Sequence, residues 1–112
     1  MIDLLPRHLA EVRSILSQYL PDTRTWAFGS RVDGTASEGS DLDMVTHLED
    51  TKLSLDPVKT AFRNSNLPFS VDLLDWAAIP EKFQHEILKN YEVICVPLSA
   101  TEVIKRNQGV QS

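Results

Sequence analysis

Apolar positions along the chain switch several times between the spacing of helices and the spacing of strands. Helical spacing first appears over residues 7–20, which predicts an amphipathic helix there. Further helices are expected over residues 55–64, with Ser54 as the N-cap, and from Pro80 onwards. Short runs rich in β-branched and aromatic residues predict four strands, at residues 25–28, 41–47, 69–75 and 91–96.

The expected order of elements is therefore helix, strand, loop, strand, helix, strand, helix, strand. This order predicts a small α/β or α+β domain, with helices over one face of a sheet and the other face free for chemistry. The loop at residues 31–40 is expected to contain one helical turn near Ala36. We expect one domain over residues 1–96, followed by a loosely held tail over residues 97–112.

Composition and charge fit a folded protein of the cytoplasm. Hydrophobic residues make up 42% and charged residues 24% of the 112 residues, which is close to ordinary globular usage. A net charge of −5 argues against direct binding to nucleic acid or to an anionic membrane. No apolar run is long enough to span a membrane, and the N-terminus does not resemble an export signal. Cys95 is the only cysteine and is expected to be a buried thiol.

Two aspartates share one face of a predicted strand. Asp41 and Asp43 are two residues apart, so their carboxylates project to the same side, about 6.5 to 7 Å apart. Aspartate is depleted in strands, and a bound divalent metal would explain the pair. Asp72 lies on a later apolar strand and joins them if the two strands are neighbours. Three carboxylates could hold two Mg²⁺ ions about 3.5 to 4 Å apart. The alternative for all three is a solvated strand position, and His47, of the same parity, is expected at the surface.

A glycine and a serine end the strand at residues 25–28. Gly29 lets the backbone approach a ligand closely, and Ser30 offers a hydroxyl and an amide, which together suit a phosphate. The alternative is an ordinary turn that ends a strand. Residues 29–43 carry one arginine against four acidic residues, so a nucleoside triphosphate would be repelled without Mg²⁺ or Mn²⁺. That arginine, Arg31, is a candidate phosphate contact, with an exposed place in the loop as the alternative.

The spacing of Gly29-Ser30, Asp41-Leu42-Asp43 and a later Asp72 resembles the DNA-polymerase-β-like nucleotidyltransferase superfamily. Within it, the chain is similar to the MNT type, the minimal nucleotidyltransferases that accompany HEPN-domain proteins. The resemblance implies a four-stranded mixed sheet and transfer of a nucleoside monophosphate, AMP from ATP, to a hydroxyl with release of pyrophosphate. It also implies roles: Asp41 and Asp43 as metal ligands, Asp72 completing the metal site and helping to deprotonate the acceptor, and the Gly-Ser turn holding the β and γ phosphates.

The resemblance implies a protein partner as well. Larger members carry a further domain that grips the acceptor, and we expect none in this chain. In MNT–HEPN systems the companion is a helical toxin ribonuclease, which the nucleotidyltransferase adenylylates, usually on tyrosine, and so neutralises. Some close relatives pair instead with a helical substrate-binding subunit. Two alternatives stay open at this point: a non-catalytic module that binds its partner, and transfer to a small molecule held with a helical subunit. A homodimer is also left open.

Overall fold

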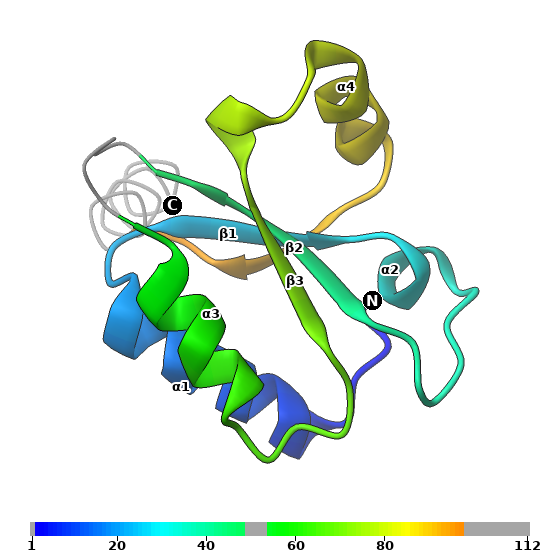
Figure 1. The fold of residues 1–112 in the computed structure, drawn as a ribbon. Coiled ribbons are helices and arrows are strands. Elements are labelled where there is room, and N and C mark those ends of the chain that lie inside the picture. Colours follow the sequence, from blue (N-terminus) through cyan, green and yellow to red (C-terminus); the bar gives the residue numbers. More distant parts are fainter. Residues whose placement is uncertain (1, 49–53, 98–112) are drawn as a thin grey trace, which may run out of the picture.

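The structure is a computed structural model that describes residues 2–48 and 54–97. Helices and strands follow the expected order, with a short helix and a 3₁₀ turn added (Figure 1). The elements are α1 (Pro6–Tyr19), β1 (Arg24–Phe28), α2 (Ser30–Asp33), β2 (Leu42–His47), α3 (Asp56–Arg63), β3 (Val71–Asp75), η1 (Trp76–Ala78), α4 (Glu81–Lys89) and β4 (Glu92–Cys95). The expected tail, apart from Pro97, lies outside the described residues. None of the helices in these ranges is long and apolar enough to cross a membrane.

The four strands form one mixed sheet in the order β3-β2-β1-β4. β1 pairs antiparallel with both β2 and β4, whereas β2 and β3 run parallel. The α+β class and the four-stranded mixed sheet are thereby confirmed. The strands that carry the sequence motifs are neighbours, because Phe28 of β1 is opposite Asp43 of β2, which is opposite Asp72 of β3.

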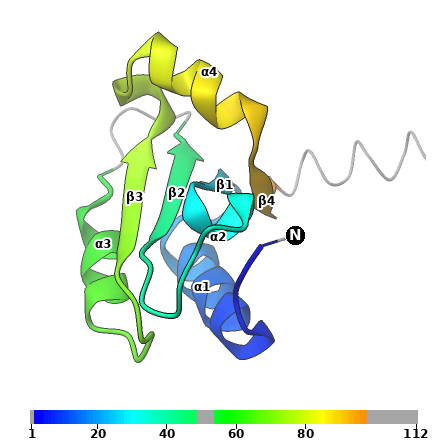
Figure 2. The ribbon, with the colours of Figure 1, turned by 90° about the vertical axis from the view of Figure 1, so that its right-hand side faces the viewer.

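One face of the sheet builds the core. α1 and α3 lie side by side over this face (Figures 1 and 2). Alternation along β2 turns Leu42 and Met44 into the core and leaves Asp43 on the opposite face. The core cluster consists of Val12, Leu16, Leu20, Ala27, Leu42, Met44, Val58, Phe62, Leu73 and Ile94. Helical packing on one face thus leaves the carboxylate-bearing face clear beside β2 and β3.

α4 lies apart from α1 and α3 in both views (Figures 1 and 2). Its Phe83 ring meets Phe28 edge to face, with centroids 5.6 Å apart. Phe28 alternates with the buried core residue Ala27, so this contact lies on the face opposite the core. The expected packing of helices on one face of the sheet therefore holds for α1 and α3, whereas α4 contacts the opposite face.

Aromatic rings cover part of the second face. Trp26 stacks on Tyr91 with centroids 4.1 Å apart, and His47 contacts both Trp26 and Trp76. His47 is half-buried, and its buried Nε2 has no hydrogen-bond partner within residues 2–48 and 54–97, so the expected surface histidine is wrong. The thiol of Cys95, expected to be buried, is half-buried, and this burial raises its pKa.

Candidate functional site

Three aspartates lie where β2 and β3 begin, two of them side by side on the open face. Asp43 and Asp72 are each the second residue of their strand and are partners in the parallel register. Paired residues of neighbouring strands point to the same face, and the strands lie about 4.8 Å apart. Asp41 directly precedes β2 and is exposed. The parallel pairing of β2 with β3 therefore places Asp72 beside Asp43, whereas the gathering of all three carboxylates at one metal site stays a prediction.

The charges of these aspartates act on one another. Burial raises the pKa of Asp43, and the negative charges of Asp72 and then Asp41 raise it further. Ionisation of the half-buried Asp43 therefore lowers the stability of the folded domain, and a nearby cation would remove this loss. This field of three negative groups favours a divalent ion.

Gly29 brings the backbone directly against Asp43. Its φ is +80°, a left-handed value that favours glycine, and a Cβ at this position would lie 2.7 Å from Oδ2 of Asp43. The amides of Val32 and Asp33 donate to the Gly29 carbonyl, which starts α2. The helical turn expected near Ala36 is therefore wrong, because the glycine turn places it directly after β1. Ser30 is the half-buried first residue of α2 and directly follows Gly29.

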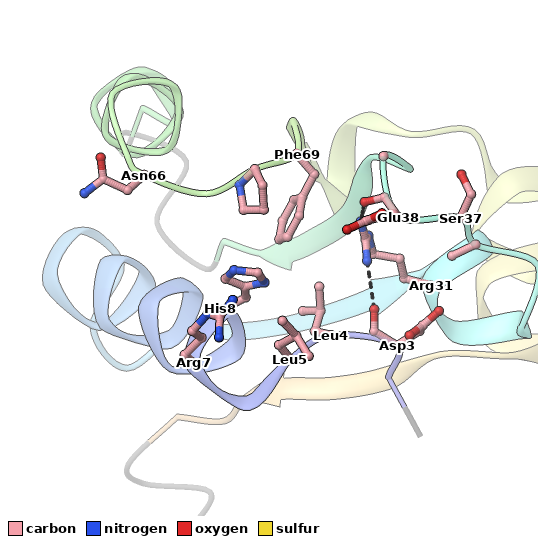
Figure 3. A pocket seen from close by; sticks show the side chains of 13 residues that line it. Asp3, Leu4, Leu5, Arg7, His8, Arg31, Ser37, Glu38, Asn66 and Phe69 are labelled. Atoms are coloured by element: carbon pink, nitrogen blue, oxygen red, sulfur yellow. Dashed lines mark hydrogen bonds between the residues drawn. The ribbon is translucent and has the colours of Figure 1, made fainter.

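Arg31 has a different place from the one we expected. Its side chain is 6% exposed and donates to three backbone carbonyls: from Nη1 to Asp3 at 2.9 Å, and from Nη2 to Glu38 at 3.1 Å and Ser40 at 2.7 Å. Nε donates to Ser40 as well, at 3.0 Å. The guanidinium also lies 4.4 Å from the centre of the Phe69 ring (Figure 3). Because its donors hold the loop that leads into β2, we assign Arg31 no part in phosphate binding.

Chemistry and position of the carboxylates suit Mg²⁺, but the protein alone supplies too few ligands. Within residues 2–48 and 54–97, no three His, Cys, Asp or Glu side chains come together closely enough to hold a metal ion. Mg²⁺ in nucleotide-processing enzymes usually takes one or two carboxylates and completes its octahedron with substrate phosphates and water. The neighbouring Asp43 and Asp72 fit that pattern, with Gly29 and Ser30 at the side where phosphates would lie.

Two cavities lie near this part of the fold, and one of them includes site carboxylates in its lining. One has a volume of about 650 Å³ and is lined by Asp41 and Asp72, together with α3 and the connection from α3 to β3. The other, of about 1000 Å³, lies between the N-terminal segment, the loop after α2 and Phe69 (Figure 3). The first contains Lys59 and Arg63, which sequence reasoning missed. Nothing in their local sequence distinguishes them from an ordinary solvated helix face.

Comparisons with known proteins agree with this geometry. Residues 11–97 match the family model described as "Polymerase beta, Nucleotidyltransferase". The chain is 47% identical over 95 residues to the probable protein adenylyltransferase MntA of Haemophilus influenzae, and the match covers 83% of each chain.

Solved structures share the fold at lower identity. A toxin–antitoxin structure with AMP-PNP has a TM-score of 0.66 at 20% identity, and the match covers 92% of this chain and 89% of that one. A toxin–antitoxin MntA–HepT structure has a TM-score of 0.61 at 16% identity, over 96% and 90% of the two chains. A protein from Shewanella oneidensis has a TM-score of 0.62 at 16% identity, with the same coverage. These likenesses show the fold, and the family match over most of the chain shows that it belongs to the polymerase-β nucleotidyltransferases.

Proposed function

We propose that this chain transfers AMP from ATP to a tyrosine hydroxyl of a helical, HepT-type toxin and is thereby the antitoxin of the pair. The observation that carries the proposal is the register pairing of Asp43 with Asp72 beside the Gly29 turn. The 47% identity to a probable protein adenylyltransferase supports a protein acceptor. The same fold in MntA–HepT and AMP-PNP structures supports the class of partner and the nucleotide.

Each residue of the site receives a role. Asp43 and Asp72, with Asp41 just before β2, would hold two Mg²⁺ ions together with substrate phosphates and water, and the bound ions would neutralise the triphosphate and make the α-phosphorus more electrophilic. The backbone at Gly29 lies closest to Asp43, and with the Ser30 hydroxyl it would hold the β and γ phosphates. Asp43 lies between that turn and β3, because it is against Gly29 on one side and is the register partner of Asp72 on the other.

The reaction is a single displacement at phosphorus. The acceptor oxygen attacks the α-phosphorus and forms a new O–P bond, while the bond to the oxygen that bridges to the β-phosphate breaks. Pyrophosphate leaves, and Asp72, exposed on the edge strand, accepts the proton of the hydroxyl. Positioning and charge neutralisation supply most of the rate in such transfers, so a small domain can carry them out.

Intact mass spectrometry of the helical protein encoded beside this chain tests the proposal. After incubation with this chain, Mg²⁺ and ATP, we expect the partner to gain one or more AMP groups on tyrosine. Asp43→Asn should abolish the gain, whereas Asp56→Asn, an exposed position on α3, should keep it. Circular dichroism of both variants checks that the fold is retained.

Three results would contradict the proposal. Neutralisation of the toxin by Asp43→Asn without any mass gain would favour a non-catalytic binding module. Transfer to a small molecule bound by the pair, with the partner unmodified, would make the helical protein a substrate-binding subunit. Equal modification by Asp43→Asn and the wild type would show that the assigned carboxylates are not the site.

A further inference from the structure

The order of the strands fixes the direction from which an acceptor can approach, and this argument rests on the proposed function. Gly29 follows β1, Asp43 lies on β2 and Asp72 on β3, so the phosphate turn and Asp72 flank Asp43 on opposite sides. In an in-line displacement the attacking oxygen and the leaving pyrophosphate lie on opposite sides of the phosphorus. With the pyrophosphate at Gly29 and Ser30, the acceptor must enter from the side of β3, the edge of the sheet.

A cavity lies at that edge. Its volume is about 650 Å³, and its walls combine Asp41 and Asp72 with one side of α3 and the chain that enters β3. We call this cavity the α3–β3 groove; the lining residues used below are Lys59, Arg63, Ser65, Ser70 and Asp72. It shares Gly39, Pro68 and Phe69 with the larger cavity of Figure 3, so the two cavities are neighbours. Together they offer room for several residues of an extended peptide.

The groove carries two cations in a chain of net charge −5. Lys59 and Arg63 are four residues apart on α3, so both lie on one face of the helix, and both are exposed. Neither side chain has a hydrogen bond or ion pair with any residue of the described ranges. The carboxylates in the same groove, Asp41 and Asp72, are committed to the metal in the proposed reaction. The outer wall is therefore a basic surface with no acidic partner of its own among those residues.

We infer that the α3–β3 groove binds the acceptor segment of the protein partner, and that Lys59 and Arg63 select acidic residues flanking the acceptor hydroxyl. An acidic segment satisfies both cations, and its hydroxyl then faces Asp72. An RNA acceptor suits the groove less well. Nucleic-acid affinity comes from neutralising many phosphates, and two cations on an acidic protein supply little of it.

Transfer to synthetic acceptors tests the inference. The probes are three pentapeptides with a central tyrosine flanked by glutamate, glutamine or lysine, together with the partner protein itself. With ATP and Mg²⁺, we expect kcat/KM for the glutamate peptide to exceed that for the lysine peptide by about tenfold or more, equivalent to one strong charge pair. The double variant Lys59→Glu, Arg63→Glu should reverse this preference and lower kcat/KM for the partner protein. Lys82→Glu, an exposed charge reversal that lines none of these cavities, should change neither.

The readouts separate this inference from the proposed function. Calorimetric binding of ATP should be the same in the double variant and the wild type, because the groove lies on the acceptor side. Equal rates on the three peptides, or an unchanged preference in the double variant, would overturn the groove while leaving the enzyme intact. Transfer of AMP to the 3′ hydroxyl of a short single-stranded RNA, with no transfer to the peptides, would also overturn the groove as a peptide site. Failure of the wild type to modify either the partner or any peptide would overturn the proposed function itself, and the groove with it.

Discussion

Arg31 should govern the stability of the domain and the position of Asp41, with no direct effect on ATP binding. Its guanidinium makes four hydrogen bonds to the carbonyls of Asp3, Glu38 and Ser40, and lies over Phe69. These contacts join the N-terminal segment, the loop before β2 and the chain before β3. Replacing Arg31 by alanine removes all of them at once.

The size of the effect follows from these contacts. For each carbonyl that loses its charged donor, the free energy of unfolding falls by about 1 kcal/mol where water can partly replace the donor, as it can at the exposed Asp3 and Glu38. The lost contact with Phe69 adds about 1 kcal/mol. Arg31→Ala should therefore lower the free energy of unfolding by about 3 to 5 kcal/mol, a large share of the ~5–15 kcal/mol typical of domains. Arg31→Lys keeps the charge but not the planar fork, so it should lose about 2 kcal/mol.

Urea unfolding followed by circular dichroism measures this loss, with Arg7→Ala as the matched control. Arg7 lines the same cavity but is exposed and has no described partner, so its replacement should change stability by less than about 0.5 kcal/mol. Steady-state kinetics should show kcat reduced by about tenfold to a hundredfold in Arg31→Ala, since misplaced catalytic groups cost rate. An unchanged unfolding energy together with a raised KM for ATP would refute this reasoning, because that is the behaviour of a phosphate ligand.

Three further predictions concern single groups. Gly29→Ala should lower kcat at least about a hundredfold, because the added Cβ would displace the Asp43 side chain. Gly34 has a similar positive φ but open space around it, so Gly34→Ala measures the effect of backbone strain alone. Equal losses of kcat in the two variants would contradict a role for the contact between residue 29 and Asp43. In EDTA at neutral pH, Asp43→Asn should be more stable to urea than the wild type, because a raised pKa means that the ionised Asp43 carboxylate lowers the stability of the folded state. This difference in stability should shrink as the pH falls through the raised pKa of Asp43 towards 3.8. Addition of 10 mM Mg²⁺ should raise the Tm of the wild type and leave that of Asp43→Asn unchanged. The wild type should lose stability as the pH falls below 6.5, because burial and the charge of Arg24 lower the pKa of His47, so that only the unfolded chain takes up the proton. Urea titrations at several pH values should find this loss absent in His47→Phe and present in His85→Gln. If the loss persists in His47→Phe, a group other than His47 causes it.

Local patterns were sufficient to predict which face of the sheet carries Asp43. Alternation along a strand puts Asp43 on the face opposite Met44 whatever the rest of the chain does. The requirement for glycine at residue 29 also has a local cause, since a strand must turn directly into a helix there. The pairing of Asp43 with Asp72 depends on the order of the strands in the sheet. Local residue patterns did not decide that order, and only the family resemblance supported it.

Contacts between distant segments were beyond such patterns. An arginine in a polar loop can serve a phosphate or backbone carbonyls equally well, and the partners of Arg31 lie as far away as Asp3 and Phe69. His47 likewise looks solvated in its own strand, because the rings that cover it include Trp76 from a later element. Both residues were placed wrongly for the same reason, since the side chains that bury them come from other parts of the fold.

The two halves of the site differ in how complete they are within this domain. On the proposed phosphate side, the backbone at Gly29 lies against Asp43, so this part of the geometry is set by the backbone of the domain itself. On the acceptor side, Asp72 is exposed on an edge strand above a groove whose cations have no described partner. On the proposed function, the chain alone would position the nucleotide, whereas the acceptor hydroxyl would gain its orientation from what fills the groove. ATP affinity should therefore be the same with and without the partner, while release of pyrophosphate should require the partner or another acceptor that fills the groove.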